Sequence, residues 1–85
     1  MQPYKILVSV DILRLTRPAG RDRERVLSFL EKLADNPNTP GDYVERDAVG
    51  RPLQIKIVGD YALTYWADHP VNEIKVIHIE RADRG

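Results

Sequence analysis

Hydrophobic positions recur at two different spacings along the chain, and the change of spacing marks a change of structure. In residues 22–35 the apolar side chains recur at intervals of three and four residues, which predicts a helix with one apolar stripe. These side chains are Val26, Phe29, Leu30 and Leu33. From residue 38 onward the apolar positions alternate with polar ones, the period of a half-buried strand. The pattern therefore predicts an α+β domain in which a long helix precedes most of the strands.

The expected strands cover residues 4–10, 43–47, 53–58, 61–67 and 73–80. Residues 59–60 and 68–72 connect the last three strands, and connections this short make neighbours antiparallel. A short helical turn is expected at residues 11–16, so two helical segments would cover one sheet face. The predicted fold is an N-terminal strand, a two-helix segment with a long second helix, and an antiparallel β-meander, all in one domain.

Specific residues mark the ends of the long helix. Asp22 is expected to cap its N terminus, because an aspartate side chain can accept hydrogen bonds from the free amides of the first turn. Asn36-Pro37 is expected to end it, since the residue before a proline is displaced from helical geometry.

Composition limits the class of protein. With 42% hydrophobic and 31% charged residues the chain is typical of a globular domain. It has no cysteine, so no disulfide or thiolate–zinc site can stabilise it. Its apolar runs fall far short of the roughly 20 residues that span a bilayer, and its N terminus lacks a signal-peptide pattern. We expect a cytoplasmic protein with no membrane association. Thirteen basic and thirteen acidic residues cancel, which argues against avid, sequence-independent nucleic-acid binding.

Three passages, in order along the chain, resemble the RelE/ParE family of toxin–antitoxin toxins. Residues 30–37, Leu-Glu-Lys-Leu-Ala-Asp-Asn-Pro, are similar to the end of that family's second helix. Residues 53–65, which include Lys-Ile-Val-Gly-Asp-Tyr, are similar to its hairpin, and residues 76–81, Val-Ile-His-Ile-Glu-Arg, to its final strand. The resemblance covers nearly the whole chain and implies a toxin component held inactive by a cognate antitoxin.

The resemblance implies one of two activities. RelE-type members are mRNA interferases, endoribonucleases that cleave mRNA on the ribosome without a metal, using the 2′-hydroxyl of the RNA as nucleophile. Such a site needs an acid and a base, and cations around the developing phosphorane charge. ParE-type members instead inhibit DNA gyrase. No cofactor or metal is expected, since His69 and His78 lie in different predicted elements and two histidines make a poor metal site.

The resemblance also suggests residues for RNA and phosphate binding. Lys56 stands where the family's hairpin carries a phosphate-binding lysine. We expect Ile55 and Ile57 to face the helices and Lys56 to project from the opposite face of the sheet. The further candidates are Arg51 from the turn, Gln54 in place of a second cation, and the aromatic residues Tyr61 and Tyr65.

The last strand offers His78 as acid or base and Arg81 as charge support, so the predicted catalytic set is Lys56, His78 and Arg81. If Ile77 and Ile79 face the core, His78 and Glu80 face the groove, Arg81 lies at the rim and Ala82 takes the place of a family arginine. If Arg81 is that arginine, the strand must slip by one residue or bulge. We prefer the first phase.

Two departures from the family pattern predict weakened or lost cleavage. Ala62 stands where the family carries an arginine that stabilises the transition state, and losing one such donor costs on the order of 10²–10³ in rate. The terminal tyrosine of many RelE-type nucleases is absent from residues 82–85. We therefore predict a toxin-family component with an antitoxin partner, with mRNA and the ribosome as further partners if it is active. The alternatives are a non-catalytic interaction module and a gyrase inhibitor. An uncovered sheet edge would allow pairing with an antitoxin strand or with a second copy as a homodimer.

Overall fold

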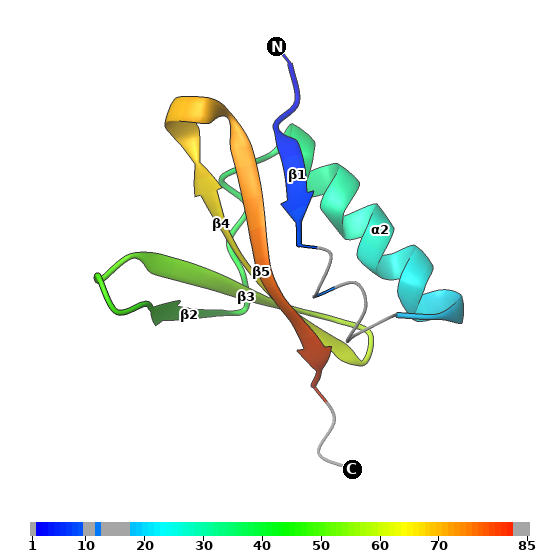
Figure 1. Ribbon diagram of the computed structural model, residues 1–85. Helices are drawn as coiled ribbons and strands as arrows, with labels where there is room; N and C mark the ends of the chain where they lie inside the picture. Colours follow the sequence, from blue (N-terminus) through cyan, green and yellow to red (C-terminus); the bar gives the residue numbers. More distant parts are fainter. Residues whose placement is uncertain (1, 10–11, 13–17, 83–85) are drawn as a thin grey trace.

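One long helix packs against one face of a five-stranded sheet in the computed structural model, which describes residues 2–9, 12 and 18–82 (Figure 1). The elements are β1 (Lys5–Val8), α2 (Gly20–Asp35), β2 (Tyr43–Arg46), β3 (Pro52–Val58), β4 (Tyr61–Asp68), the 3₁₀ helix η1 (His69–Val71) and β5 (Glu73–Arg81). Of the helical turn expected at residues 11–16, only Ile12 belongs to the described residues. In the described part of the chain α2 is the one extended helix, so the two-helix segment is not confirmed.

The sheet is mixed, with the strand order β1-β5-β4-β3-β2. Strands β2 to β5 are antiparallel neighbours, as their short connections require. β1 pairs with β5 in parallel, with Lys5 opposite Glu73. The prediction of an antiparallel meander is therefore incomplete. The chain between β1 and β5 includes all other elements, which is long enough for a parallel pairing.

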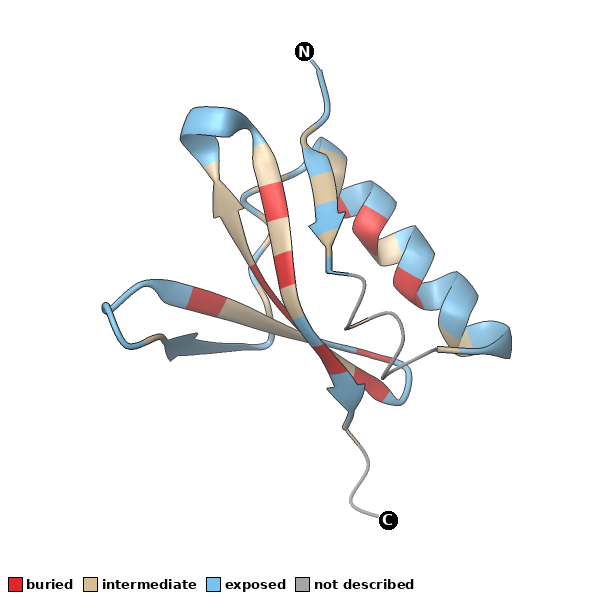
Figure 2. Cartoon of the chain, in the orientation of Figure 1, coloured by how far each residue is buried: buried red, intermediate tan, exposed pale blue. Residues whose placement is uncertain are grey.

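The main cluster of buried residues lies between α2 and the sheet surface that it covers (Figure 2), whereas the buried Leu53 and Thr64 lie outside this cluster. Leu33, Leu63 and Ile74 have no exposed surface, and Tyr65 is 1% exposed. Burial of each such side chain contributes roughly 1.5–3 kcal/mol. The half-buried Phe29 of α2 packs on Tyr65 with 5.7 Å between ring centroids. The predicted apolar stripe of α2 is therefore its core-facing side.

The N terminus of α2 differs from the prediction. The helix begins at Gly20, its N-cap residue is Ala19, and no side chain caps it. Asp22 lies inside the first turn, where a negative charge is favoured by the helix dipole, and its Oδ1 is 3.6 Å from Nη1 of Arg25. Asp22 is therefore not the N-cap, because the helix extends two residues beyond it.

β5 contains a bulge opposite the middle of β4. Thr64 is paired with His78 and Tyr65 with Val76, so Ile77 has no partner across the pair of strands. The bulge exchanges the faces of β5. On its N-terminal side Ile74 and Val76 are in the core, and on its C-terminal side Ile79 is.

Candidate functional site

Lys56 lies on the sheet face that α2 covers. It is paired with Leu63, and Leu63 with Ile79, both of which belong to the core beneath the helix. Directly paired residues project from the same face, so the prediction that Lys56 faces away from the helix is wrong. β3 carries apolar residues on both faces, and alternation alone could not show which face the helix covers. Val58 reaches the core, whereas Ile55 and Ile57 do not.

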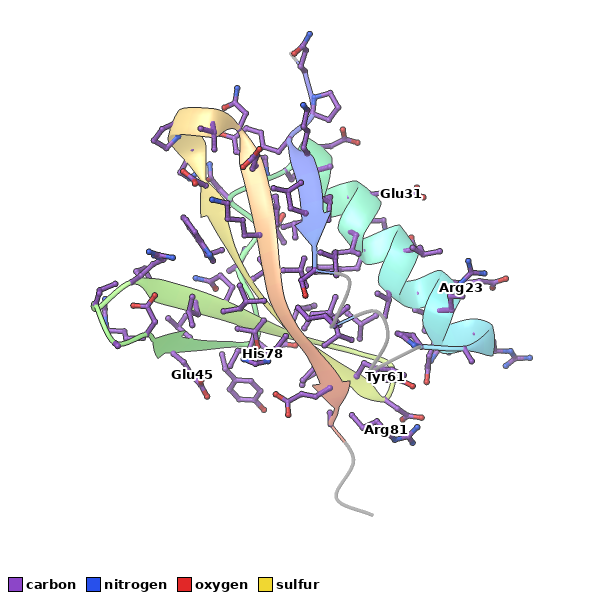
Figure 3. The ribbon with its side chains drawn as sticks, viewed as in Figure 1. Arg23, Glu31, Glu45, Tyr61, His78 and Arg81 are labelled. Carbon is purple, nitrogen blue, oxygen red and sulfur yellow. The ribbon has the colours of Figure 1, made fainter. Side chains whose placement is uncertain are left out.

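His78 projects from the opposite face. It is paired with Thr64, and Thr64 with Ile55, so these three form one row across the sheet. Ile79 is 5% exposed and faces the core, as the preferred phase has it, but Ile77 lies in the bulge and is not among the core residues, so that phase is correct only for the C-terminal part of β5. Figure 3 shows His78 in the middle of β5, away from the hairpin that joins β3 to β4. Lys56 and His78 therefore do not share a groove.

Tyr61 begins β4 and Arg81 ends β5, and the two residues lie together (Figure 3). They are directly paired, and the centre of the Arg81 guanidinium is 5.7 Å from the centroid of the Tyr61 ring. Tyr61 is 7% exposed and belongs to the core, so Arg81 projects from the helix-covered face. The three predicted catalytic side chains thus occupy separate places: His78 on one face, and Lys56 and Arg81 on different parts of the other.

Two further predicted residues are held by the linker that joins α2 to β2, residues 36–42. The Tyr65 hydroxyl donates a hydrogen bond to the Thr39 carbonyl oxygen at 3.1 Å. The backbone N–H of Gly41 donates to Oε1 of Gln54 at 2.8 Å. The linker therefore lies over the part of β3 and β4 that carries these two candidate side chains.

Asp42, at the end of this linker, binds Lys56. Its Oδ1 lies 3.2 Å from the Lys56 ammonium nitrogen, and its Oδ2 accepts a hydrogen bond from the backbone N–H of Ile57 at 2.9 Å. The bond from Ile57 and then the bond from Lys56 hold the pKa of the Asp42 carboxyl below its usual range. Asp42 thus stays negative and partly neutralises Lys56.

The environment of Tyr65 makes its hydroxyl a persistent donor. Burial raises the pKa of Tyr65 to about 12, and the negative charge of Asp42 acts in the same direction. A phenol with this pKa remains protonated at neutral pH. Tyr65 can therefore donate a hydrogen bond in this site and is poorly suited to act as a base.

Arg51 is directed away from Lys56. Its guanidinium carbon lies 4.0 Å from the centroid of the Trp66 ring, and the Lys75 ammonium is 5.0 Å from the same centroid. Each cation also has a carboxylate neighbour: Asp47 is 3.6 Å from Arg51, and Asp68 is 2.8 Å from Lys75. Arg51 therefore belongs to an aromatic and ionic cluster and does not complete a phosphate site with Lys56.

We call the sheet face that carries His78 the open face, because no helix in the described part of the chain lies over it (Figure 1). By strand register its residues are Lys5, Leu7, Tyr43, Glu45, Leu53, Ile55, Ile57, Ala62, Thr64, Trp66, Asp68, Glu73, Lys75, His78 and Glu80. Tyr43 is 62% exposed and Ile57 37%. Two lysines stand against four carboxylates on this face, so it is slightly acidic, and its apolar part is in the middle of β3 and β4, at Ile55, Ile57 and Ala62.

Asp42 is the residue that the sequence reasoning missed as a contact point of the site. No periodic pattern relates position 42 to position 56, because their contact depends on the path of the linker across β3. A signal for the linker did exist in Pro40-Gly41, since a glycine beside a proline marks a segment with unusual backbone demands.

No family model matches the chain, and the comparison with curated proteins finds no match. Solved structures do match. A chain of the archaeal RelE–RelB complex from Pyrococcus horikoshii has a TM-score of 0.77 and 16% identity, covering 98% of this chain and 99% of that one. The chain has a RelE-like fold. A chain of the RelBE2 toxin–antitoxin complex from Mycobacterium tuberculosis has a TM-score of 0.65 and 19% identity, covering 93% and 98%.

Among the residues that the structure describes, no group of three or more histidine, aspartate or glutamate side chains is arranged to hold a metal ion. None of the described helices has the length and apolar character needed to cross a membrane.

Proposed function

We propose that this chain is the toxin-family component of a toxin–antitoxin pair, that it acts in the cytoplasm, and that a cognate antitoxin binds its open face. The observation that carries the proposal is a sheet face with an apolar middle, left uncovered in the described part of a RelE-like fold. Such a face favours a partner that supplies the missing layer. β2 adds a sheet edge on which all four residues are exposed, and an extended antitoxin segment can pair with it.

The charges of the chain favour a protein partner over RNA. Phosphate binding depends on cations that are available to neutralise the backbone. Lys56 is paired with Asp42, Arg51 with Asp47, and Lys75 with Asp68. The open face has more acidic than basic residues. These pairings support a component whose own cleavage of RNA is weak or absent.

The geometry points the same way. Cleavage by Lys56 and His78 requires both side chains to reach one phosphodiester, and they project from opposite faces. The test is ribosome-dependent mRNA cleavage by the wild type, by Lys56→Ala and by His78→Ala. We expect all three to stay at the background of a protein-free reaction. If the wild type cleaves mRNA strongly and either substitution abolishes this cleavage, the proposed loss of activity is overturned.

A non-catalytic interaction module on the same scaffold is the second candidate, and the ion pairing of Lys56, Arg51 and Lys75 favours it. Induced expression in a bacterial host separates it from a toxin. Growth arrest supports a toxin if the product of an adjacent short reading frame relieves it. Inhibition of gyrase in a supercoiling assay would then identify gyrase as the target. Harmless expression at high level supports the module.

A further inference from the structure

One row of paired residues on the open face has opposite charges at its two ends. The row crosses β2, β3, β4 and β5 and consists of Glu45, Leu53, Trp66 and Lys75. A two-fold axis that runs along the strands, between β3 and β4, reverses the order of this row in a second copy of the chain. Such an axis places Glu45 of each copy against Lys75 of the other, and the two apolar side chains against each other.

The next row along the strands fits the same axis. It consists of Tyr43, Ile55, Thr64 and His78. The axis passes between the two middle residues, so Ile55 of each copy lies against Thr64 of the other, and the tyrosine ring lies against the histidine ring. The row has no carboxylate, lysine or arginine, and it forms the apolar centre of the contact.

The third row continues the apolar strip of β3 and β4. It consists of Ile57, Ala62 and Glu80. The axis places the large Ile57 side chain on the small side chain of Ala62, as interdigitating layers require. Across the three rows no two groups of like charge face each other. We propose that two copies of this chain pack open face to open face about this axis when no antitoxin is bound.

The size of the contact predicts a weak, reversible dimer. Four strands about 4.8 Å apart and three rows about 6.8 Å apart offer on the order of 300–400 Å² of each copy. A standard interface covers roughly 800 Å² of each partner, so we expect a dissociation constant on the order of 10–100 µM. The newly covered surface belongs mainly to Tyr43 and Ile57, which are 62% and 37% exposed.

The charged ends of the contact are accessible. Glu45 is exposed, and the Lys75 side chain is 36% exposed although its ammonium lies 2.8 Å from Asp68. A lysine in this position can reach a second carboxylate, because an ammonium has three donors. Within one copy Glu45 and Lys75 are separated by two strands, so an interaction between these two side chains identifies a contact between copies.

The dimer uses the surface that we propose for the antitoxin, so the two contacts exclude each other. The inference does not depend on the antitoxin, because it follows from the rows of the open face alone. Its test uses the purified chain by itself. A chain that remains monomeric leaves the antitoxin contact standing, and a chain that binds no antitoxin leaves the dimer standing.

The test is sedimentation equilibrium from about 5 to 500 µM, a range that brackets the expected dissociation constant. We expect the wild type to change from monomer to dimer over this range. Ile55→Asp places a charge in the apolar centre and is expected to remain monomeric throughout. Circular dichroism checks that the variant is folded, and Ile57→Asp, at a more exposed position of the same strip, replaces it if it is not.

Charge reversal tests the direction of the axis. Glu45→Lys and Lys75→Glu are each expected to weaken the dimer about tenfold, because each replaces two attractive contacts by two repulsive ones. The double variant is expected to return to within about threefold of the wild type. Glu80→Lys is the matched control, with the same change of charge on the same face but no Lys75 opposite it. It is expected to leave the dimer unchanged and to give no rescue of Lys75→Glu.

Three results would overturn the proposal. The first is a wild type that stays monomeric up to the highest concentration. The second is a dimer that the aspartate in the apolar centre does not disrupt. The third is a double charge reversal that stays as weak as the single ones, or a rescue by Glu80→Lys in its place. If Lys75→Glu is unfolded, Glu45→Lys and Glu80→Lys are compared alone, and equal effects of the two on the dimer would overturn the axis.

Discussion

Lys56 and His78 project from opposite faces of one sheet. Lys56 is paired with the fully buried Leu63, and His78 with Thr64, the next residue along β4. Successive residues of a strand alternate between faces, so a separation of one position places the two candidate groups on either side of the sheet. This relationship removes the predicted pairing of a phosphate-binding cation with an acid–base group.

Leu63 is expected to be a major contributor to stability. It has no exposed surface and lies in the centre of β4 beneath α2. Leu63→Ala should lower the free energy of unfolding by about 2–5 kcal/mol, measured by urea denaturation. Val49→Ala is the control, because Val49 is 79% exposed and its truncation should stay within about 0.5 kcal/mol. Similar losses in both variants would show that the core is placed wrongly.

Tyr65 is expected to make the fold sensitive to alkaline pH. Its folded-state pKa of about 12 lies above the ordinary value of 10.0, so the unfolded chain loses this proton first. The stabilising contribution is complete below pH 10 and is lost as the pH rises toward 12. Tyr65→Phe removes the titrating hydroxyl. Relative to wild type, the free energy of unfolding of this variant should therefore rise as the pH increases over this range, as measured by denaturation curves. A constant difference between the two proteins would contradict the burial of this hydroxyl.

Asp42 is expected to make the stability of the fold depend on pH in the acid range. Its folded-state pKa lies below the ordinary value of 3.8, so its contribution is present above that pH and is lost as the pH falls through the lowered pKa. Asp42→Asn should be less stable than wild type near neutral pH, and the difference should shrink below pH 3.8. Thermal unfolding across this range measures it. A difference that persists unchanged into strong acid would rule out the ion pair with Lys56 as its source.

Gly41 is expected to be needed for the close approach of the linker to β3. A Cβ at this position would lie 2.5 Å from the Ile55 carbonyl oxygen and 2.7 Å from its nitrogen, both backbone atoms that cannot rotate away. Gly41→Ala should cost about 1–3 kcal/mol and speed hydrogen exchange at the Ile57 amide. Gly50→Ala, at a positive φ of 82° but in open space, is the control, since its strain should leave this amide protected. Equal exchange in both variants would contradict the contact.

The elements of the fold could be predicted because their signals are local. The 3.6-residue period of residues 22–35 corresponds to α2, which begins two residues earlier, at Gly20. The alternating segments correspond to β3, β4 and β5 with similar small differences at their ends. The parallel pairing of β1 with β5 could not be predicted in the same way, because it joins segments far apart in the chain and has no periodic signature.

The site was less predictable because it depends on which face each strand presents. Alternation showed that Lys56 and Ile57 face opposite ways, but it could not show which of the two faces the helix. Burial does not decide it either, because Leu53 and Val58 are both buried and lie on opposite faces of β3. The covering of one end of β3 by the linker depends on tertiary packing. The bulge at Ile77 changes the phase of β5, and its one mark in the sequence is the adjacent apolar pair Val76-Ile77, which interrupts the alternation.

The most direct test of the proposed role is native mass spectrometry of the chain produced together with the product of an adjacent short reading frame. Our account predicts a complex of the two proteins, in which hydrogen exchange slows at open-face residues such as Ile55 and Thr64. Tyr43→Asp should weaken the complex, because Tyr43 is 62% exposed on that face, and Leu27→Asp on the outer side of α2, where Leu27 is 46% exposed, should not. Recovery of the chain without its neighbour's product, or a complex that leaves the open face unprotected, would contradict the account.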